Sequence, residues 1–181
     1  MDKPKAKIYI DGANIFYTQK QIGWNIDWKK VKKYLEKKSE IVEMRYYTGV
    51  KNNDVKMSKY LNYFDKVGIT TVTKPIKIIK TSNGNIFKSN FDVEMTTDVL
   101  LDRILLDKII LFTGDSDFNY LIKKLKDLGK YVVVYSSRKM LSWELKLNAN
   151  QYVFLEDIKD EIKRNNQKKP PSLRRSSVKH K

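Results

Sequence analysis

The chain has 181 residues, of which 41% are hydrophobic and 12% aromatic, so its composition excludes wholesale disorder. No apolar run is long enough to span a membrane, and the lysine-rich N-terminus lacks the apolar stretch of a secretory signal. The 37 Lys and Arg outnumber the 21 Asp and Glu, and the formal net charge of +16 favours a polyanionic partner. We therefore expect a basic cytoplasmic protein.

The first half of the chain alternates predicted strands and helices. In chain order these are a strand over 7–11, a helix from Ile15, a helix over 28–38 capped by Asp27, a strand over 41–50, a helix over 55–67 that ends at Gly68, and extended segments over 69–73 and 76–80. Residues 82–85 (S-N-G-N) are a hairpin-turn signal. Residues 74–88 are thus predicted to form a hairpin suited to pairing between copies of the chain, as a homo-oligomer, or to contact with a strand.

The second half continues the alternation. It predicts a helix from Asp92 to about Leu106, an apolar strand over 108–113, a helix over 116–128 that ends at Gly129, a strand over 131–136, a helix over 141–147 and a short strand over 152–155. Strands that are apolar throughout are buried on both faces. The pattern predicts one α/β domain over 1–162, a doubly wound, mostly parallel sheet flanked by helices.

The C-terminal segment 163–181 differs from the body. It holds eight Lys and Arg and no acid, and Leu173 and Val178 are its aliphatic residues. Such a segment cannot bury enough surface to offset the entropy of ordering it, so we expect a flexible basic tail. Because the body is also basic, nucleic acid is the favoured partner. A solubilising end is the alternative, and an acidic membrane surface fits less well without an amphipathic helix.

Carboxylates are the candidate functional groups, because the chain has no Cys and its single His is His180. Ligands of open parallel sheets bind at the carboxyl ends of the strands. Asp11 ends the first predicted strand, and Asp115 and Asp117 follow the strand over 108–113. Asp92 and Asp98 lie between them on one predicted helix. Clustered carboxylates repel one another unless a cation offsets their charge, and Mg²⁺ or Mn²⁺ suits a site that also holds phosphate.

Each of these acids also has an ordinary structural interpretation. Asp115 or Ser116 could cap the following helix, and Asp92 could cap its own. Asp98 could be a solvated helix position, like Asp102. Asp11 is harder to explain in this way, because an acid directly after a buried strand is costly without a partner. Together the acids favour a metal site at one sheet edge.

Four segments carry a family resemblance. They are Y-I-D-G-A-N-I-F over 9–16, K-S-N-F-D-V-E-M-T-T-D over 88–98, F-T-G-D-S-D-F over 112–118, and L-S-W-E-L with A-N-Q-Y-V-F-L within 141–155. In these motifs the chain resembles the NYN domain, a branch of the PIN-like nuclease superfamily that is also similar to the 5′-nuclease fold. The first and third motifs are the more specific, and the tail lies outside the resemblance.

The resemblance implies hydrolysis of RNA with motif acids that bind Mg²⁺ or Mn²⁺. The matching positions here are Asp11 and Asn14 in the first motif, Asp92 and Asp98 in the second, and Asp115 and Asp117 in the third. Three positions depart from the family pattern: Thr113 stands where Ser is commoner, Glu94 where a small or apolar residue is usual, and Asn150 where Asp is frequent.

Our hypothesis from the sequence is a metal-dependent ribonuclease. Asp11, Asp98 and Asp115 are expected to hold the principal metal, and Asp92 and Asp117 a second or outer shell. The metal would lower the pKa of a bound water towards about 7 and stabilise charge on the phosphate. The expected substrate contacts come from Asn14, Lys88, Ser116, Trp24 and the tail, with single-stranded RNA as the favoured target. Tyr17 and Phe118 are further candidates for base stacking, with core packing as the alternative for Phe118 and Trp24.

Three other functions compete with this hypothesis. The first is a catalytically silent RNA-binding or adaptor protein in which the acids are structural. The second is a phosphatase-like enzyme with Asp11 as nucleophile, which usually needs a second acid where Ala13 stands. The third is a topoisomerase-primase-type metal fold, which expects Glu in place of Asp11. The sequence leaves open which RNA is cut, whether cleavage is internal or terminal, and whether DNA is also a substrate.

Overall fold

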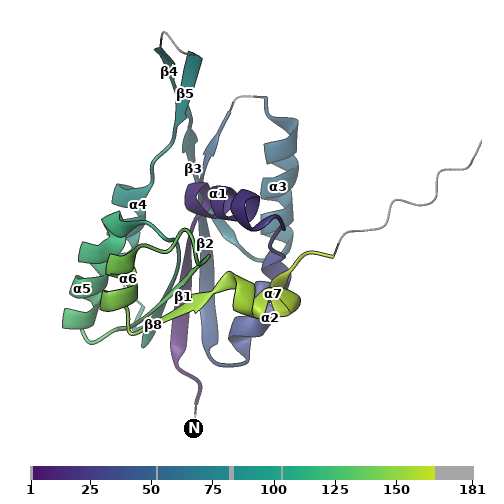
Figure 1. Cartoon of the computed structure of the whole chain (residues 1–181). Coiled ribbons are helices and arrows are strands. Elements are labelled where there is room, and N and C mark those ends of the chain that lie inside the picture. Colours follow the sequence, from purple (N-terminus) through teal and green to yellow (C-terminus); the bar gives the residue numbers. More distant parts are fainter. Residues whose placement is uncertain (1, 52, 82–83, 103, 166–181) are drawn as a thin grey trace, which may run out of the picture.

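The computed structural model describes residues 2–51, 53–81, 84–102 and 104–165, and its centre is a six-stranded sheet (Figure 1). The strand order is β3-β2-β1-β6-β7-β8, and every pairing in it is parallel. The strands are β1 (Lys5–Asp11), β2 (Glu40–Val50), β3 (Thr70–Pro75), β6 (Lys108–Phe112), β7 (Tyr131–Ser136) and β8 (Gln151–Phe154). This arrangement confirms the predicted parallel α/β fold.

Helices cover both faces of the sheet. They are α1 (Gly12–Ile22), α2 (Trp28–Glu36), α3 (Val55–Lys66), α4 (Asp92–Leu100), α5 (Asn119–Asp127), α6 (Trp143–Asn148) and α7 (Lys159–Ile162), with 3₁₀ turns η1 (Ser116–Phe118) and η2 (Leu155–Ile158). Ile8 and Ile10 of β1 pack with the face that α1, α2 and α3 cover, whereas Tyr9 packs with the face that α4, α5 and α6 cover. Side chains alternate across a strand, so burial on both faces explains why these strands are apolar throughout.

The order of strands reverses beside β1. The chain runs from β1 outward through β2 to β3 and then crosses to β6, which pairs with the other side of β1. Ile10 lies opposite Phe112 in that pairing, so the two strands end side by side. A reversal of this kind opens a crevice at the carboxyl ends of the strands, where ligands of such sheets bind.

Several helix ends follow the predicted signals. The Asp27 carboxylate accepts hydrogen bonds from the backbone N–H of Lys29 and Lys30, and so caps α2. Gly68 and Gly129 follow α3 and α5 with a φ of 72°, a conformation that glycine adopts without strain. The short helical segment η2–α7 after β8 was not predicted.

The helix that begins at Asp92 differs from its prediction at both ends. Its N-cap is Phe91, and Asn90 Oδ1 accepts a hydrogen bond from the Asp92 N–H. The helix ends at Leu100, well before the predicted Leu106. Just after this end, Asp102 Oδ1 accepts a hydrogen bond from the Ile104 N–H and its Oδ2 accepts one from Tyr9 Oη of the sheet.

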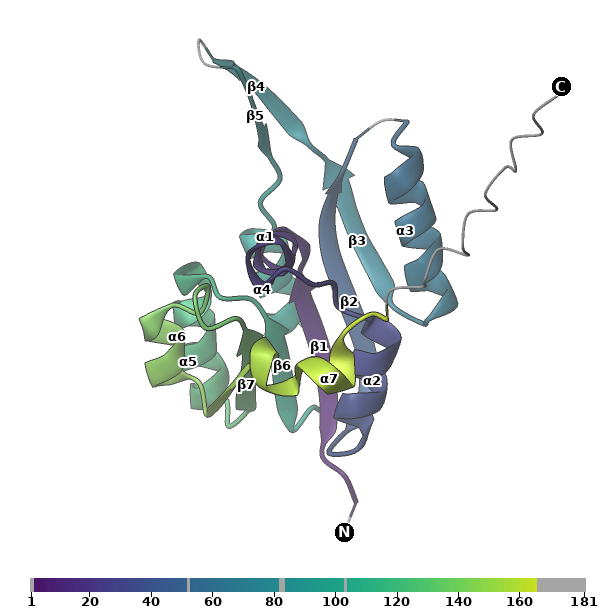
Figure 2. The same ribbon diagram turned by 45° about the vertical axis from the view of Figure 1, so that its right-hand side comes forward.

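The predicted hairpin is present as β4 (Lys77–Thr81) and β5 (Gly84–Lys88), which pair antiparallel. It projects beyond the carboxyl edge of the large sheet, on the side where α1 lies (Figures 1 and 2). Turn residues 82 and 83 and the side chains over 78–88 lie outside the described part of the chain, and Lys88 is among them.

The start of the expected tail is joined to the body. Lys163 forms a β-bridge with Ile26, the Arg164 N–H donates to the Asn25 carbonyl, and Lys30 Nζ donates to Asn165 Oδ1. Residues 166–181, the rest of the expected tail, lie outside the described residues. Within the described residues, no helix is long and apolar enough to cross a membrane.

Candidate metal centre

Three carboxylates meet at the carboxyl edge of the sheet. Asp11 ends β1, Asp92 begins α4 and Asp115 follows β6. One oxygen of each lies within 4.8 Å of the others, and all three residues are partly buried. We call these residues the edge cluster. Segments far apart in the chain therefore bring three acids to the point where the strand order reverses.

Asp11 is held from two sides. Its Oδ1 accepts the Asn14 N–H at 3.0 Å, which caps α1. Its Oδ2 accepts a hydrogen bond from Thr113 Oγ1 at 3.2 Å. The carboxylate is thus fixed between the first turn of α1 and the end of β6.

The loop that carries Asp115 is tied to the same place. Thr113 Oγ1 accepts the Asp115 N–H at 3.2 Å, so this hydroxyl bridges the two acids. Asn14 Oδ1 accepts the Gly114 N–H at 3.0 Å. The Asn14 side-chain oxygen, predicted to contact substrate, is therefore engaged in joining the Asp11 and Asp115 loops. The sequence pattern did not single out Thr113 for its bridging role.

Two motif glycines are required by close packing. A Cβ on Gly12 would lie 2.4 Å from the Tyr47 carbonyl oxygen. A Cβ on Gly114 would lie 2.1 Å from the Met140 carbonyl oxygen and 2.6 Å from Ser136 Oγ. Both distances are far below van der Waals contact, so a larger residue would displace the loop next to each acid.

Burial and mutual repulsion disfavour the negative charge of the carboxylates in the edge cluster. Burial raises the pKa of Asp11, and the charges of Asp92 and Asp115 add to this, against hydrogen bonds from Asn14 and Thr113. Burial likewise raises the pKa of Asp92, with further increases from Asp115 and Asp117. The ion pairs found among the described residues involve other acids. A bound cation would relieve this repulsion.

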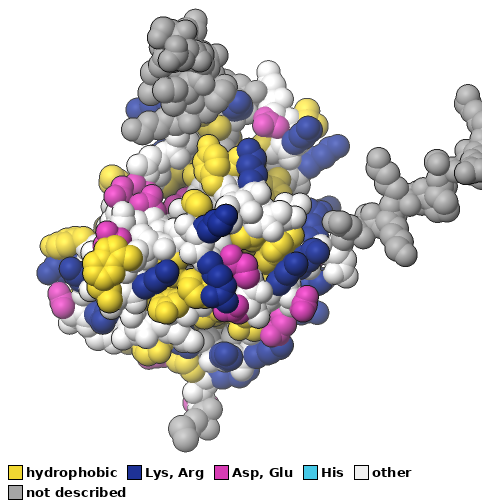
Figure 3. Space-filling view, viewed as in Figure 1, with side chains coloured by type: hydrophobic (Ala, Val, Ile, Leu, Met, Phe, Trp, Pro, Cys, Tyr) yellow, Lys and Arg dark blue, Asp and Glu magenta, His cyan; other side chains and the backbone are white. Residues whose placement is uncertain are grey.

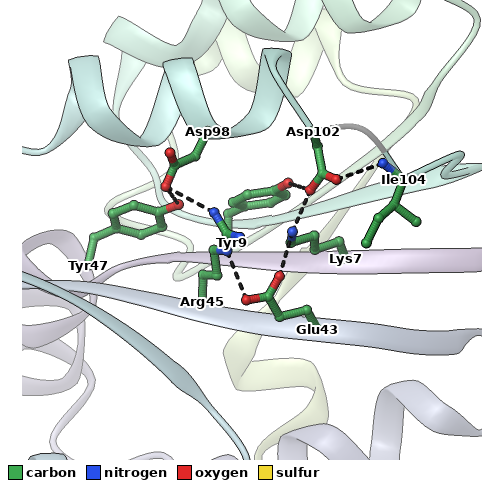
Figure 4. Close-up of polar contacts among 8 residues, drawn as sticks. All are labelled: Lys7, Tyr9, Glu43, Arg45, Tyr47, Asp98, Asp102 and Ile104. Atoms are coloured by element: carbon green, nitrogen blue, oxygen red, sulfur yellow. Dashed lines mark hydrogen bonds and ion pairs between the residues drawn. The ribbon is translucent and has the colours of Figure 1, made fainter.

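Asp98, expected to hold the principal metal, lies outside the edge cluster. Its Oδ2 accepts a hydrogen bond from Tyr47 Oη at 2.8 Å and pairs with Arg45 Nη1 at 3.2 Å (Figure 4). Asp98 lies six residues after Asp92, about 9 Å further along α4. The structure therefore brings Asp92 into the edge cluster and pairs Asp98 with a guanidinium.

Asp98 belongs to a second group of charges, which we call the interior network: Lys7, Tyr9, Glu43, Arg45, Tyr47, Asp98 and Asp102 (Figure 4). Lys7 Nζ pairs with Asp102 and, at 2.5 Å, with Glu43. Only 2% of the Lys7 side chain and 8% of the Asp102 side chain are exposed. The expectation of a solvated Asp102 was wrong, because β1 supplies a buried ammonium beneath it.

The remaining predicted site residues are either exposed or buried in the core. Ser116 and Asp117 are exposed beside Asp115, and the Asp117 N–H donates to Asp115 Oδ1. Trp24 is 8% exposed and packs in the core. Phe118 is buried in the other core cluster, so packing rather than base stacking accounts for it. Tyr17 is exposed, as a stacking residue must be.

Asn150, where the family often has Asp, has a structural role in this chain. Its Oδ1 accepts the Val132 N–H at 2.8 Å, and its own N–H donates to the Val132 carbonyl. Asn150 therefore orders the entry of the chain into β8 beside β7. Glu94 pairs with Lys74 Nζ at 2.5 Å instead of joining the edge cluster.

The fold and the position of these acids agree with a PIN-like nuclease fold, the fold that an NYN domain implies. The chain belongs to the NYN domain family, whose model matches residues 5–156. It is 32% identical over 171 residues to the Low amplitude and bright protein LabA of Synechococcus elongatus, covering 92% of this chain and 91% of that protein. It is also similar to the crystal structure of a protein of unknown function from Vibrio parahaemolyticus, with a TM-score of 0.75, 25% identity, and coverage of 90% of this chain and 97% of that one.

Proposed function

We propose that the protein is a divalent-metal-dependent ribonuclease that hydrolyses phosphodiester bonds of RNA at the edge cluster. The observation that carries the proposal is the approach of three carboxylate oxygens to within 4.8 Å at the reversal point of the sheet. The raised pKa of Asp11 and Asp92 adds support, because ligands for a cation are expected to repel one another without it.

The donor set fits Mg²⁺ or Mn²⁺. Both are hard cations that prefer carboxylate oxygen. One oxygen from each of the three carboxylates lies within 4.8 Å of the others, so the three could reach a single ion. Asp11, Asp92 and Asp115 would hold the ion, and exposed Asp117 would lie in its outer shell. Such an ion supplies a water of lowered pKa and stabilises charge on the phosphate, which needs no His or Cys.

The chain's own residues fix this arrangement. Thr113 holds Asp11 and Asp115 in register, and Asn14 holds the loop between them. Their hydrogen bonds fix the Asp11 carboxylate and the backbone of the loop that carries Asp115, which would reduce the conformational entropy lost on binding a cation.

Basic side chains lie on the same face of the molecule as the acidic centre (Figure 3). Acidic side chains gather near the N-terminal end of α4, and Lys and Arg are spread over α1, α2, α3 and α7 (Figure 3). Lys74 lies close enough to Asp92 to lower its pKa. The basic side chains would attract the phosphate backbone of RNA, so RNA binding should weaken steeply as the salt concentration rises. The acids would bind the cation.

The test is cleavage of labelled single-stranded RNA in Mn²⁺ or Mg²⁺, with a reaction in EDTA beside it. The wild type should cut only with the metal. Asp11→Asn with Asp115→Asn should lower the rate at least a hundredfold, because the metal supplies several kcal/mol of charge stabilisation. Asp157→Asn, which removes an exposed acid elsewhere, is the matched control and should leave the rate unchanged.

Two results would contradict the proposal. If the wild type binds RNA without cutting it, and the double variant binds equally well, the protein is a catalytically silent RNA-binding protein. If Asp98→Asn abolishes Mn²⁺ binding while Asp92→Asn retains it, the ligand set proposed here is wrong.

A further inference from the structure

The outer face of α1 exposes two neighbouring aromatic side chains that the fold does not bury. Phe16 is 50% exposed and Tyr17 is 59% exposed. The inner face of the same helix buries Ile15 and Thr18. Exposed aromatic rings side by side contribute little to the core, so their placement calls for another explanation.

A lysine accompanies these rings. Lys20 follows Phe16 by one helical turn, and its Nζ lies 4.3 Å from the Phe16 ring centroid and 5.8 Å from that of Tyr17. The two rings meet edge to face, with centroids 5.5 Å apart. The surface of α1 thus presents two aromatic faces with a positive charge that can turn away from them.

The helix that carries this surface begins at the edge cluster. Asp11 is the N-cap of α1, and the helix crosses the carboxyl edge of the sheet (Figure 2). Phe16 lies about 8 Å and Lys20 about 14 Å along the helix from Asp11, by the helical rise. Beyond them a surface pocket of about 280 Å³ is lined by Phe16, Gln19, Lys20, Gly23, Trp24 and Asn25.

We propose that Phe16, Tyr17 and Lys20 form a stacking platform for unpaired bases of a strand that runs along α1 into the edge cluster. The two rings stack on bases, and Lys20 turns from the rings to the phosphate backbone. The platform rests on the proposed nuclease function, because it supplies the strand to that centre.

Single-stranded RNA fits this surface better than a protein partner does. Exposed aromatic rings beside a lysine offer what an unpaired nucleotide needs, a flat apolar face and a counter-charge for its phosphate. A duplex keeps its base faces covered, so it could use only the charge. The high positive charge of the chain acts in the same direction.

The test is binding of a short labelled single-stranded RNA to the full chain in EDTA, where no cleavage interferes. Phe16→Leu with Tyr17→Leu keeps apolar side chains of high helix propensity and removes the rings. The dissociation constant should rise tenfold or more, as for loss of base–aromatic stacking. Phe16→Tyr should bind like the wild type. Thermal unfolding of each variant verifies that it is folded.

The matched control is another aromatic–lysine pair. Tyr131 at the start of β7 is 43% exposed, and Lys108 Nζ lies 5.8 Å from its ring centroid. The pair lies at the amino edge of the sheet, opposite the edge cluster. Tyr131→Leu should leave RNA binding unchanged. An equal loss from this variant would mean that exposed aromatics act without regard to position, and would overturn the platform.

An RNA with abasic positions separates stacking from charge. We call the Phe16→Leu, Tyr17→Leu double variant the leucine variant. The wild type should bind the abasic RNA about as weakly as the leucine variant binds intact RNA. The leucine variant should bind the abasic RNA little more weakly than it binds intact RNA. Lys20→Gln should lower the salt dependence of binding by about one phosphate contact. Equal binding of intact RNA by the wild type and the leucine variant would overturn the platform.

Failure of the platform and failure of the nuclease proposal give different results. Binding in EDTA that depends on Phe16, with no cleavage in Mn²⁺, would leave the platform and refute the nuclease. Cleavage in Mn²⁺ with binding and KM unchanged in the leucine variant would leave the nuclease and refute the platform.

Discussion

The edge cluster and the interior network share two elements, β1 and α4, yet their surroundings act on negative charge in opposite ways. β1 contributes Asp11 to the edge cluster and Lys7 to the interior network. α4 begins with Asp92 in the edge cluster, and Asp98 near its end belongs to the network. A few residues along one strand and one helix therefore separate two different acidic environments.

The pKa shifts of the acids mark the difference. Burial acts to raise the pKa of both Glu43 and Asp102 in the interior network, but hydrogen bonds and basic partners outweigh it, and both values are lowered. In the edge cluster burial and neighbouring carboxylates dominate, so the pKa values of Asp11 and Asp92 are raised. Acids that have Lys or Arg partners stabilise the fold, whereas acids gathered without them are suited to a cation from solution.

The largest expected effect tests the interior network. Lys7→Met should lower the free energy of unfolding by about 3–5 kcal/mol at pH 7, because Glu43 and Asp102 lose their buried partner. Urea unfolding measures the change. Lys124→Met, which breaks the exposed pair with Asp127, is the control and should cost less than about 1 kcal/mol. If both variants lose the same free energy of unfolding, then the buried ion pairs of Lys7 stabilise the fold no more than the exposed pair of Lys124.

The next effect tests the edge cluster with a cation. Mn²⁺ at a hundredfold excess over its dissociation constant should raise the free energy of unfolding by about 2.7 kcal/mol, since it binds the folded state. Thermal unfolding with and without Mn²⁺ measures this. Asp92→Asn should reduce the gain strongly, and Asp98→Asn should keep most of it. An equal gain in wild type and Asp92→Asn would place the cation elsewhere.

The sequence predicted the sheet and the position of the centre, because both depend on local signals. Apolar strands indicate a parallel sheet, and acids directly after two strands must reach the same edge if the strands are neighbours. Asp11 and Asp115 therefore could be placed without a structure.

The placement of Asp98 outside the edge cluster could not be predicted from the sequence. It depends on Arg45 and Tyr47, which are far away in the chain and reach Asp98 only because β2 packs beneath α4. The burial of Trp24 could not be predicted for a similar reason, since an aromatic residue that follows a helix gives the same signal whether its ring is buried or exposed. Phe16 had no signal beyond its position in a helix, and only its exposure distinguishes it.

The smallest expected effect concerns how the free energy of unfolding depends on pH, which should be opposite for the two acidic regions. In EDTA, Asp11→Asn should raise the free energy of unfolding at pH 7 by about 0.5–1 kcal/mol, because it removes a charge that the site disfavours. Asn keeps the oxygen that accepts the Asn14 N–H, so the helix cap remains. When the pKa of a carboxyl group is raised in the folded state, that group makes the protein less stable as the pH rises above the group's ordinary pKa of 3.8. The gain from Asp11→Asn should therefore vanish in acid and grow towards neutral pH.

The penalty of Lys7→Met should also shrink in acid, but for the opposite reason. The lowered pKa values of Glu43 and Asp102 mean that their contribution is present at neutral pH and is lost as pH falls below their ordinary values. Wild-type stability thus rises with pH through the interior network and falls with pH through the edge cluster. Urea unfolding of the two variants from about pH 3 to 7, in EDTA, measures both slopes. If Asp11→Asn destabilises the metal-free protein at pH 7, the Asp11 charge stabilises the fold and the distinction between the two regions fails.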